Sequence, residues 1–392
     1  MRNRLKLLYD GNLFCLKGRT GLYRVASDLL RAFVESPLFD VTLIQPVAEA
    51  PQDVPLQNGS WVKMPLLKSM METGPFAPKE TPVLQAQRKH YQRVMQKYNA
   101  YFSPFFPVPA IAVEAGLITG LFVHDMIPIY EPQYASDSTF SQRYTTWMQN
   151  NRSDFVAVNS KWTESQYRLF RPDYDPTRMV LSYLGADKRF QPQPEDKIKA
   201  VREKYRIPNR TYFLSVCEIT ERKNLPHVLK AFVRFLEETG ADDVCLVLTG
   251  PKRSEHEKVF QTIVSLKKYQ HKIIQTGFVP DADMPALYSG ATGFVYLSLS
   301  EGFGLPILEA MQCGTPVLSA DNTSLPEVGG SAVLYVSGHH VPETAQGFLT
   351  LYSQPLLRAE LAEKGRIQAS RFSLARTSGA IMGKFLSLAA DK

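Results

Sequence analysis

Cysteine is scarce in this chain of 392 residues, and its placement argues against two kinds of site. The four cysteines lie far apart, with no Cys-x-x-Cys pair and no histidine-paired spacing: Cys15, Cys217, Cys245 and Cys313. A disulfide framework and a structural zinc site would both need a recognisable spacing. We therefore interpret the cysteines as buried thiols of a protein in a reducing cytoplasm.

Long apolar runs are absent too. No stretch approaches the roughly 18 residues that a membrane-spanning helix needs. The basic N-terminus precedes only a short apolar stretch and no small-residue cleavage site, so it predicts a first strand rather than a signal peptide. A hydrophobic fraction of 44% excludes a disordered chain, and a charged fraction of 21% excludes a coiled coil.

Motifs of cofactor-binding proteins are missing as well. The fingerprint G-x-G-x-x-G does not follow the first strand, which argues against a nicotinamide oxidoreductase. No signal indicates the pyridoxal lysine that a glycogen-phosphorylase-like enzyme would need. The string Asp281-Ala282-Asp283 fits the metal motif D-x-D, but it stands in a turn before an expected helix, where we interpret it as an N-cap pair. We expect no obligatory metal and no cofactor.

Positive charge is in modest excess. The chain has 45 Lys and Arg against 38 Asp and Glu, a formal net charge of +7, which indicates anionic partners. The most basic stretch, residues 88–98, precedes the aromatic pairs Tyr101-Phe102 and Phe105-Phe106. It predicts either a basic helix face that leads into a buried strand end or a surface for an anionic membrane. A nucleic-acid site would need a longer stripe with aromatic platforms, so we expect no nucleic acid.

Short apolar runs alternate with helical patterns, which is typical of parallel α/β layers. In the first half we expect four strands: Leu5–Tyr9, Asp40–Ile44, Gly120–His124 and Phe155–Asn159. Helices are expected over Gly21–Val34 and Ser160–Phe170, the second with a serine N-cap. The Pro-rich stretch 190–196 predicts a linker, because each proline bars the preceding residue from a helix.

The second half repeats the alternation. Its expected strands are Tyr212–Cys217, Val244–Leu248, Ile273–Thr276, Gly293–Leu297 and Pro316–Ser319, and its expected helices are Leu225–Leu236, Met284–Tyr288 and Pro306–Gln312. We therefore predict domains at 1–188 and 189–371, with a helix in 372–392 that packs back on the first domain. Two such sheets facing each other would form a cleft, with ligands at the carboxyl ends of the strands.

Residues 298–311 carry the densest chemical signal. A strand runs into Glu301-Gly302-Phe303-Gly304 and then into a helix, whose free amides favour an anion such as a diphosphate. Glu309 follows Glu301 by about two helical turns, so both carboxylates are expected on one side, one for a ribose diol and the other for a sugar hydroxyl. In the alternative interpretation Glu301 only caps the helix dipole and Glu309 pairs with a lysine on a solvated face.

The segment resembles the Glu-x7-Glu signature of the retaining glycosyltransferases of family 4, which have the GT-B fold. The resemblance runs in order over most of residues 9–375. It continues in these stretches: Gly21–Val25, His124–Pro128, Glu221–Leu225, Gly277–Asp281, Leu287–Ala291, Phe294–Tyr296, Cys313–Val317 and Ser324–Gly330. The His-Asp-x-x-Pro stretch resembles a bacterial mannosyltransferase-like branch. The resemblance implies two doubly wound Rossmann-like domains that face each other across a cleft.

The resemblance also implies roles for the motif residues. Glu309 would bind the ribose hydroxyls of the donor. Glu301 would contact hydroxyls of the donor sugar and is the better candidate to act in the chemistry. Arg222 and Lys223 would neutralise the diphosphate and support the leaving group. The donor would also meet the start of the motif helix, where the binding residues are Gly302, Phe303, Gly304 and Leu305. For Arg222 and Lys223 alone, the other interpretation is a solvated basic turn.

Further roles fall outside this segment. Val279 would lie near the base, and Gly21 would leave room for the phosphate and the acceptor. His124 would reach the transferred sugar, with Asp125 orienting or charging its imidazole. A lone histidine at a strand end is also compatible with a purely structural hydrogen bond. Three features depart from the family: Cys217-Glu218 where relatives have glycine, Ser300 before the first Glu, and a split pair of glycines, Gly18 and Gly21.

The implied activity is transfer of a hexose, with retention, from a nucleoside diphosphate sugar to a glycan or lipid-linked acceptor in bacterial surface polysaccharide synthesis. The mannosyltransferase-like branch favours GDP-mannose as the donor. The implied location is the cytoplasm, with peripheral contact on the inner face of the membrane left open. The alternatives are a sugar-nucleotide-binding GT-B protein of another activity, such as an epimerase, and a non-catalytic member of the fold.

Overall fold

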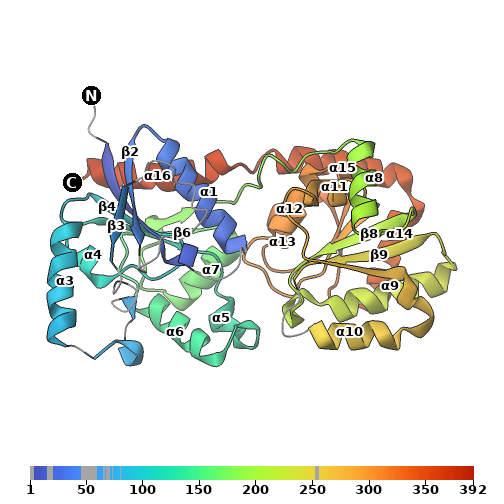
Figure 1. Cartoon of the computed structure of the whole chain (residues 1–392), viewed down its shortest axis with the longest axis horizontal. Coiled ribbons are helices and arrows are strands. Elements are labelled where there is room, and N and C mark those ends of the chain that lie inside the picture. Colours follow the sequence, from blue (N-terminus) through green and yellow to red (C-terminus); the bar gives the residue numbers. More distant parts are fainter. Residues whose placement is uncertain are drawn as a thin grey trace. The chain divides into compact units, whose positions relative to one another are not determined.

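The computed structural model describes residues 4–15, 21–45, 60–64, 67, 71–72, 74–79, 81–251 and 256–392, apart from the side chains of His256 and Lys258 (Figure 1). They form two compact units. The first unit comprises Met1–Leu184 and Ser373–Lys392, and the second comprises Gly185–Phe372. Each unit contains one sheet of parallel strands, which confirms the predicted pair of doubly wound α/β units.

The first unit is built on a seven-stranded sheet in the order β3-β2-β1-β4-β5-β6-β7. Every pair of neighbours in it is parallel. Its strands are β1 Leu5–Asp10, β2 Phe39–Gln45, β3 Ser60–Lys63, β4 Ala100–Ser103, β5 Ile118–Val123, β6 Phe155–Val158 and β7 Met179–Leu181. The four predicted strands are β1, β2, β5 and β6. Three strands were not among those predicted. The edge strands β3 and β7 are short and have no buried residues, and β4 is fully buried but only four residues long.

Helices cover the first sheet on both faces. They are α1 Gly21–Glu35, α3 Pro82–Met95, α4 Ala110–Glu114, α5 Ile127–Tyr130, α6 Ser138–Gln149, α7 Lys161–Phe170 and α16 Leu374–Ala390. The predicted cap of α7 is confirmed, because Ser160 Oγ accepts a hydrogen bond of 3.0 Å from the backbone N–H of Thr163. No helix in the described residues is long and apolar enough to cross a membrane.

The last helix, α16, belongs to the core of the first unit. It lies beside α1 on one side of the sheet (Figure 1). Phe385 of α16 is fully buried and packs edge-on against four aromatic rings, with ring centroids 4.8–6.4 Å apart. These rings come from α1 and three strands: Phe33, Phe39, Phe102 and Phe155. The chain thus returns from the second unit to complete the core of the first.

The second unit has a six-stranded sheet in the order β10-β9-β8-β11-β12-β13. Its strands, again parallel, are β8 Thr211–Val216, β9 Val244–Thr249, β10 Ile273–Gly277, β11 Gly293–Tyr296, β12 Val317–Ala320 and β13 Val333–Val336. Its helices are α8 Glu195–Lys204, α9 Leu225–Thr239, α10 His256–Ser265, α11 Met284–Ser289, α12 Leu305–Gln312, α13 Leu325–Gly329, α14 Val341–Ser353 and α15 Pro355–Ala369. In Figure 1, α9 and α10 lie on one side of this sheet and α11 and α12 on the other.

The Pro-rich stretch 190–196 is part of the second unit rather than a loose linker. Phe190 is buried, and its ring lies 5.9 Å from that of Tyr288. The backbone N–H of Gln193 donates to Ser289 Oγ at 3.0 Å, and Pro194 then precedes the first turn of α8. The two units therefore divide between Leu184 and Gly185, ahead of the segment that the prolines marked.

Truncating Phe385 should destabilise the first unit. We expect Phe385→Ala to lower its free energy of unfolding by about 3–5 kcal/mol, because the substitution leaves a cavity among packed rings. Urea titration followed by circular dichroism measures this loss. The control is Leu356→Ala on α15, where the side chain is 86% exposed and we expect a change within about 0.5 kcal/mol. Equal stability of the two variants would contradict a role of α16 in this core.

Candidate active site

The candidate site of the second unit lies where its strand order reverses. Strand β8 has β9 on one side and β11 on the other, and the connections from β8 and β11 leave on opposite faces of the sheet. Such a reversal opens a crevice at the carboxyl ends of the two strands, where open α/β sheets bind ligands. The loops that follow these strands carry the residues singled out in the sequence: Cys217, Arg222, Lys223, Glu301 and the glycines after it.

The two loops are joined by hydrogen bonds to backbone carbonyls. Leu299 donates its N–H to the carbonyl of Arg222 at 2.8 Å, and Arg222 Nη1 donates to the carbonyl of Ser300 at 2.5 Å. After a short 3₁₀ turn, Asn224 adopts a left-handed conformation with φ of 57°, which asparagine tolerates better than most residues. That turn ends the loop, and α9 begins at Leu225.

Glu301 pairs with both basic residues of the neighbouring loop. Its Oε2 lies 2.9 Å from Arg222 Nη1. Its Oε1 accepts hydrogen bonds from the Lys223 ammonium and, at 2.7 Å, from the hydroxyl of Tyr296. The Glu301 and Lys223 side chains are nearly buried, and Arg222 is partly exposed. The predicted alternatives for these residues, a carboxylate that only caps a helix and a solvated basic turn, are therefore wrong.

Charge pairing controls the protonation state of this cluster. Burial by itself would raise the pKa of Glu301, but the charges of Arg222 and Lys223 outweigh it and hold the pKa well below its usual value. Burial, together with the charge of Arg222, lowers the pKa of Lys223. Burial and the Glu301 charge raise the pKa of Tyr296 far above its usual value. At neutral pH Glu301 is therefore a carboxylate, and Tyr296 keeps its proton.

The glycine loop is shaped by backbone geometry and by the start of α13. Gly304 has φ of 116°, and a Cβ there would come within 2.9 Å of Leu325, so only glycine fits without strain. Ser324 Oγ donates to the carbonyls of Glu301 and Phe303 at 2.9 and 2.8 Å. The helix α12 then begins at Leu305. These contacts hold the loop in place, and its predicted role in binding the donor stays a prediction.

Glu309 lies in the middle of α12 and is only 4% exposed. Its Oε2 accepts a hydrogen bond of 3.0 Å from the hydroxyl of Tyr288 on α11. The predicted alternative of a lysine partner on a solvated face is wrong, because this face of α12 is buried. A buried carboxylate held by a tyrosine hydroxyl is compatible with hydroxyl recognition, and binding of a ribose remains untested.

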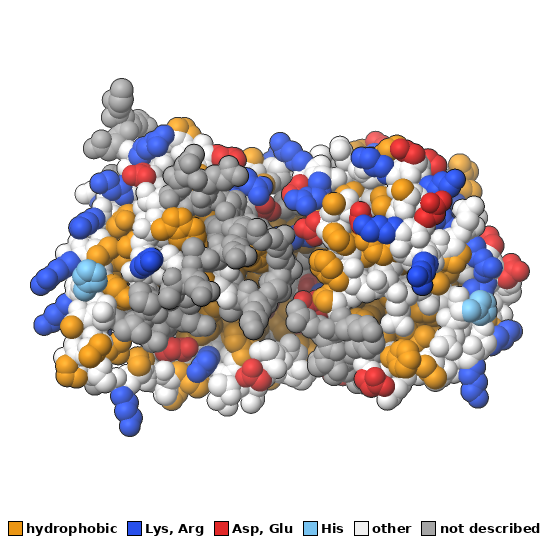
Figure 2. All heavy atoms as spheres, in the orientation of Figure 1, with side chains coloured by type: hydrophobic (Ala, Val, Ile, Leu, Met, Phe, Trp, Pro, Cys, Tyr) orange, Lys and Arg blue, Asp and Glu red, His pale blue; other side chains and the backbone are white. Residues whose placement is uncertain are grey.

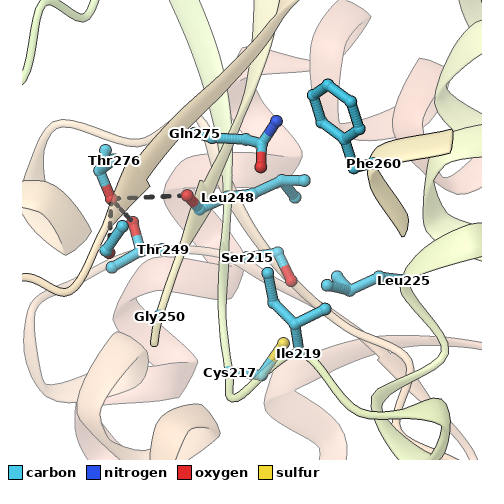
Figure 3. Close-up of a pocket in the computed structure, with 11 residues that line it drawn as sticks. Ser215, Cys217, Ile219, Leu225, Leu248, Thr249, Gly250, Phe260, Gln275 and Thr276 are labelled. Atoms are coloured by element: carbon cyan, nitrogen blue, oxygen red, sulfur yellow. Dashed lines mark hydrogen bonds between the residues drawn. The ribbon is translucent and has the colours of Figure 1, made fainter. Parts of the chain in front are cut away.

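A pocket of about 370 Å³ opens at the carboxyl ends of β8, β9 and β10 (Figure 3). Ser215, Cys217, Thr249, Gln275 and Thr276 supply its polar groups. Thr276 Oγ1 hydrogen-bonds Thr249 Oγ1 at 3.0 Å, as the dashed line in Figure 3 shows. Among the residues that the structure describes, none that lines the pocket is charged.

Of two residues that the sequence analysis named, Cys217 lines this pocket and Val279 does not. Cys217, which replaces a glycine of the resembled family, projects into it, and burial raises the pKa of its thiol to about 11. The thiol is therefore protonated at neutral pH. Val279 is buried two residues beyond β10 and is not among the lining residues. Its position near a base stays a prediction.

The predicted residues of the first unit lie at the ends of β5 and at the start of α1. His124 is buried and its Nε2 hydrogen-bonds the carbonyl of Pro104 at 2.8 Å, which is the structural bond that was weighed against catalysis. Burial lowers the pKa of His124 to about 4, so the imidazole is neutral and Nε2 is the donor. The prediction that Asp125 charges this ring is therefore wrong, because the imidazole is neutral. Asp125 Oδ1 instead accepts a hydrogen bond of 3.1 Å from the backbone N–H of Ile127.

The glycine loop of the first unit is described only from Gly21 onward. Gly21 is the first residue of α1, and a Cβ there would meet no atom within 4 Å in the described part of the chain. Its predicted role toward the phosphate and the acceptor stays a prediction. Gly18, Arg19 and Thr20 lie outside the described residues.

The D-x-D string has partners of its own. Asp281 lies 3.7 Å from Arg189, and Asp283 accepts hydrogen bonds of 2.6 Å from Lys204 and from the hydroxyl of Tyr205. Asp283 occupies the N-cap position of α11, as predicted, but its side chain makes no capping hydrogen bond. The described residues contain no group of three or more His, Cys, Asp or Glu side chains placed to hold a metal ion.

Sequence reasoning missed the residues that support the acidic pair. Tyr296 holds Glu301, Tyr288 holds Glu309, and Ser324 and Asn322 hold the carbonyls of the motif loop. The stretches that contain both tyrosines and Ser324 belong to the family resemblance. Nothing in their spacing assigns them a partner. Tyr288 and Ser324 reach residues more than 20 positions away, and the contact of Tyr296 with Glu301 depends on the course of the loop after β11.

Comparison with known proteins gives a family match for the second unit. Residues 197–368 match the family "Glycosyl transferases group 1". The O-antigen chain mannosyltransferase B of Escherichia coli is 35% identical over 206 residues, which cover 53% of this chain and 53% of that protein. The serotype-specific mannosyltransferase WbdA of Escherichia coli is 27% identical over 258 residues, 65% of this chain and 32% of that protein. The chain thus spans about half the length of the first of these relatives and about a third of the second.

Among solved structures, the chain resembles Anabaena Alr3699/HepE, determined in complex with UDP and glucose. The TM-score is 0.76 at 16% identity, over 98% of this chain and 100% of that one. A likeness at this identity establishes the shared fold, which is the GT-B fold predicted from the sequence.

Removing the charge of Glu301 should destabilise the second unit in a pH-dependent way. We expect Glu301→Gln to lower the free energy of unfolding by about 3–5 kcal/mol at pH 7, because it leaves the nearly buried Lys223 and the partly exposed Arg222 without their counter-charge. Since the folded-state pKa of Glu301 is lowered, its contribution is present above the unfolded value of about 4.3 and is lost as pH falls. The difference between wild type and variant should therefore narrow below about pH 4.

Urea titrations across this pH range measure that difference. Glu237→Gln, at an exposed position of α9, removes a carboxylate charge outside the cluster and should change stability by less than about 0.5 kcal/mol. A Glu301→Gln variant as stable as Glu237→Gln at pH 7 would contradict the assigned ion pairs.

Proposed function

Residues 197–368 belong to the glycosyl transferases group 1 family, and from this premise we propose that the chain is a retaining glycosyltransferase. It transfers a hexose from a nucleoside diphosphate sugar to an acceptor hydroxyl. The observation that carries the proposal is the pair of cations, Arg222 and Lys223, held by Glu301 at the strand-order reversal of the second sheet. A nearly buried cation pair at such a crevice suits a diphosphate.

The proposed chemistry relies on charge stabilisation. When the bond between the anomeric carbon and the diphosphate oxygen breaks, negative charge develops on the leaving group. Arg222 and Lys223 stabilise that charge from fixed positions, so little reorganisation is needed during the reaction. Glu301 holds both cations in place, and we propose that a remaining lone pair of its carboxylate accepts a hydrogen bond from a sugar hydroxyl.

Retention follows from a front-face route. The acceptor oxygen forms its bond to the anomeric carbon on the side from which the diphosphate leaves, and the acceptor proton passes to the departing phosphate oxygen. This route needs no protein nucleophile and works by positioning. As proposed, it requires no metal.

We propose GDP-mannose as the donor and a glycan or lipid-linked acceptor of bacterial surface polysaccharide synthesis, with the reaction in the cytoplasm. Support comes from the two mannosyltransferases of Escherichia coli described above. The name of one of them identifies it as a mannosyltransferase of the O-antigen chain. Glu309, buried beside Tyr288, is proposed to bind the ribose. UDP-glucose is the donor to test against it, since UDP and glucose occupy the Anabaena structure.

Nucleotide binding provides the first test. We expect GDP to raise the melting temperature of the wild type, because a ligand at about 100 Kd stabilises the native state by about 2.7 kcal/mol. The rise should persist in EDTA and should be lost in Glu309→Gln but not in Glu237→Gln. Thermal unfolding with GDP, UDP and ADP measures it. A rise in melting temperature with UDP alone would replace GDP-mannose by a UDP-sugar as the proposed donor. No rise with any of the three nucleotides would contradict the transferase proposal and favour a non-catalytic GT-B protein.

The same proposal includes a membrane surface on the first unit. Lys89 and Arg93 are exposed one turn apart on α3, and Lys97 is exposed just beyond its end. Arg88 is not part of this face, because it pairs with Glu114 at 2.5 Å. Val83, at the first turn, is 67% exposed. In Figure 2, Lys and Arg side chains line the left edge of the view, where α3 lies in Figure 1.

Charge reversal tests this surface. Each basic residue near an anionic bilayer contributes about 1 kcal/mol, so we expect the double variant Lys89→Glu, Arg93→Glu to bind phosphatidylglycerol vesicles at least about tenfold more weakly. Vesicle pelleting at low salt measures the partition coefficient, with phosphatidylcholine vesicles as the neutral reference. The control is Lys197→Glu, Lys199→Glu on α8, two exposed lysines of the second unit. No binding of the wild type at low salt would refute the membrane surface.

A further inference from the structure

The hydroxyl of Tyr296 bridges the two opposite charges of the candidate site. It accepts a hydrogen bond from Lys223 Nζ at 2.8 Å and donates one to Glu301 Oε1 at 2.7 Å. Lys223 Nζ also lies 5.1 Å from the centre of the Tyr296 ring, within the range of a cation–π contact. One side chain thus holds both the carboxylate and the ammonium.

Tyr296 is itself fixed in place. It is the last residue of β11, it is buried, and its ring stacks on that of Phe294 with centroids 5.7 Å apart and planes 23° apart. A lysine side chain, in contrast, has a flexible four-carbon stem, which does not fix the orientation of its ammonium group. The direction of the ammonium is therefore set by the strand-borne tyrosine and by Glu301.

The ammonium keeps one donor for a ligand. A lysine ammonium has three N–H groups. Tyr296 and Glu301 accept two of them, and in the described part of the chain the third has no protein acceptor. Because two of the three N–H directions are fixed, the third direction is fixed as well.

We propose that Tyr296 is a positioning residue, which aims the third N–H of Lys223 at the diphosphate of the donor. The inference rests on the proposed function for the identity of the ligand. It adds a residue that the sequence did not single out, and it predicts that diphosphate affinity depends on a hydroxyl that does not itself touch the ligand.

Tyr296→Phe removes the hydroxyl and keeps the ring. We expect the affinity for inorganic pyrophosphate and for GDP to fall roughly 10- to 100-fold, the range for loss of a hydrogen bond to a charged group. Isothermal titration calorimetry on the full chain measures both ligands. Tyr212→Phe is the matched control: it removes another buried tyrosine hydroxyl of the second unit, which donates to the carbonyl of Leu287 at 2.7 Å, and should leave both affinities unchanged.

A double-mutant cycle separates positioning from general structural damage. If Tyr296 acts through Lys223, the double variant Tyr296→Phe, Lys223→Met should bind pyrophosphate no more weakly than Lys223→Met alone. Losses that add would overturn the proposal, and so would a Tyr296→Phe variant that binds like the wild type. A wild type that binds no pyrophosphate would overturn it too. Pyrophosphate binding with this coupling, but without sugar transfer, would remove the proposed function and leave the positioning role standing.

Discussion

The site depends on one buried electrostatic arrangement: a carboxylate, Glu301, between the two cations Arg222 and Lys223. Taking three charges out of water is costly, and the cost is offset only when the geometry is good and the remaining hydrogen-bonding groups are satisfied. Here Tyr296 supplies a further donor to Glu301, and Arg222 also donates to the carbonyl of Ser300. The arrangement is therefore a poor source of stability by itself, but it fixes the relative positions of the two loops that carry the proposed chemistry.

The fold provides the positions that this arrangement needs. The parallel strands β8 and β11 are neighbours, so the loops at their carboxyl ends emerge side by side. Residues 78 positions apart in the chain, Lys223 and Glu301, thereby come into contact. The second acidic residue, Glu309, is fixed separately by the packing of α12 on α11, where Tyr288 reaches it. The second unit thus holds the groups proposed to bind phosphate and hydroxyls on independent supports.

Much of the fold and part of the candidate site could be predicted from the sequence, and the features that were missed have identifiable physical reasons. The strands β8 and β9 and the helices α1 and α9 are long and strongly patterned, and the motif around Glu301 has a distinctive order of residues. In contrast, β3 has the burial pattern of an edge strand and no apolar run. The prolines near residue 192 suggested a linker, although Phe190 buries its ring in the second unit. The partners of Glu301 and His124 depend on tertiary contacts, which no local pattern encodes.

The aromatic core of the first unit has a consequence for how the protein is made. Its strands are translated first, but Phe385 is translated only after the whole second unit. During synthesis domains generally fold in the order in which they leave the ribosome. In this chain the second unit has every element of its sheet before α16 is made, whereas the first must keep a hydrophobic groove open until then. A chaperone would therefore be needed most while the first unit has been synthesised but α16 has not.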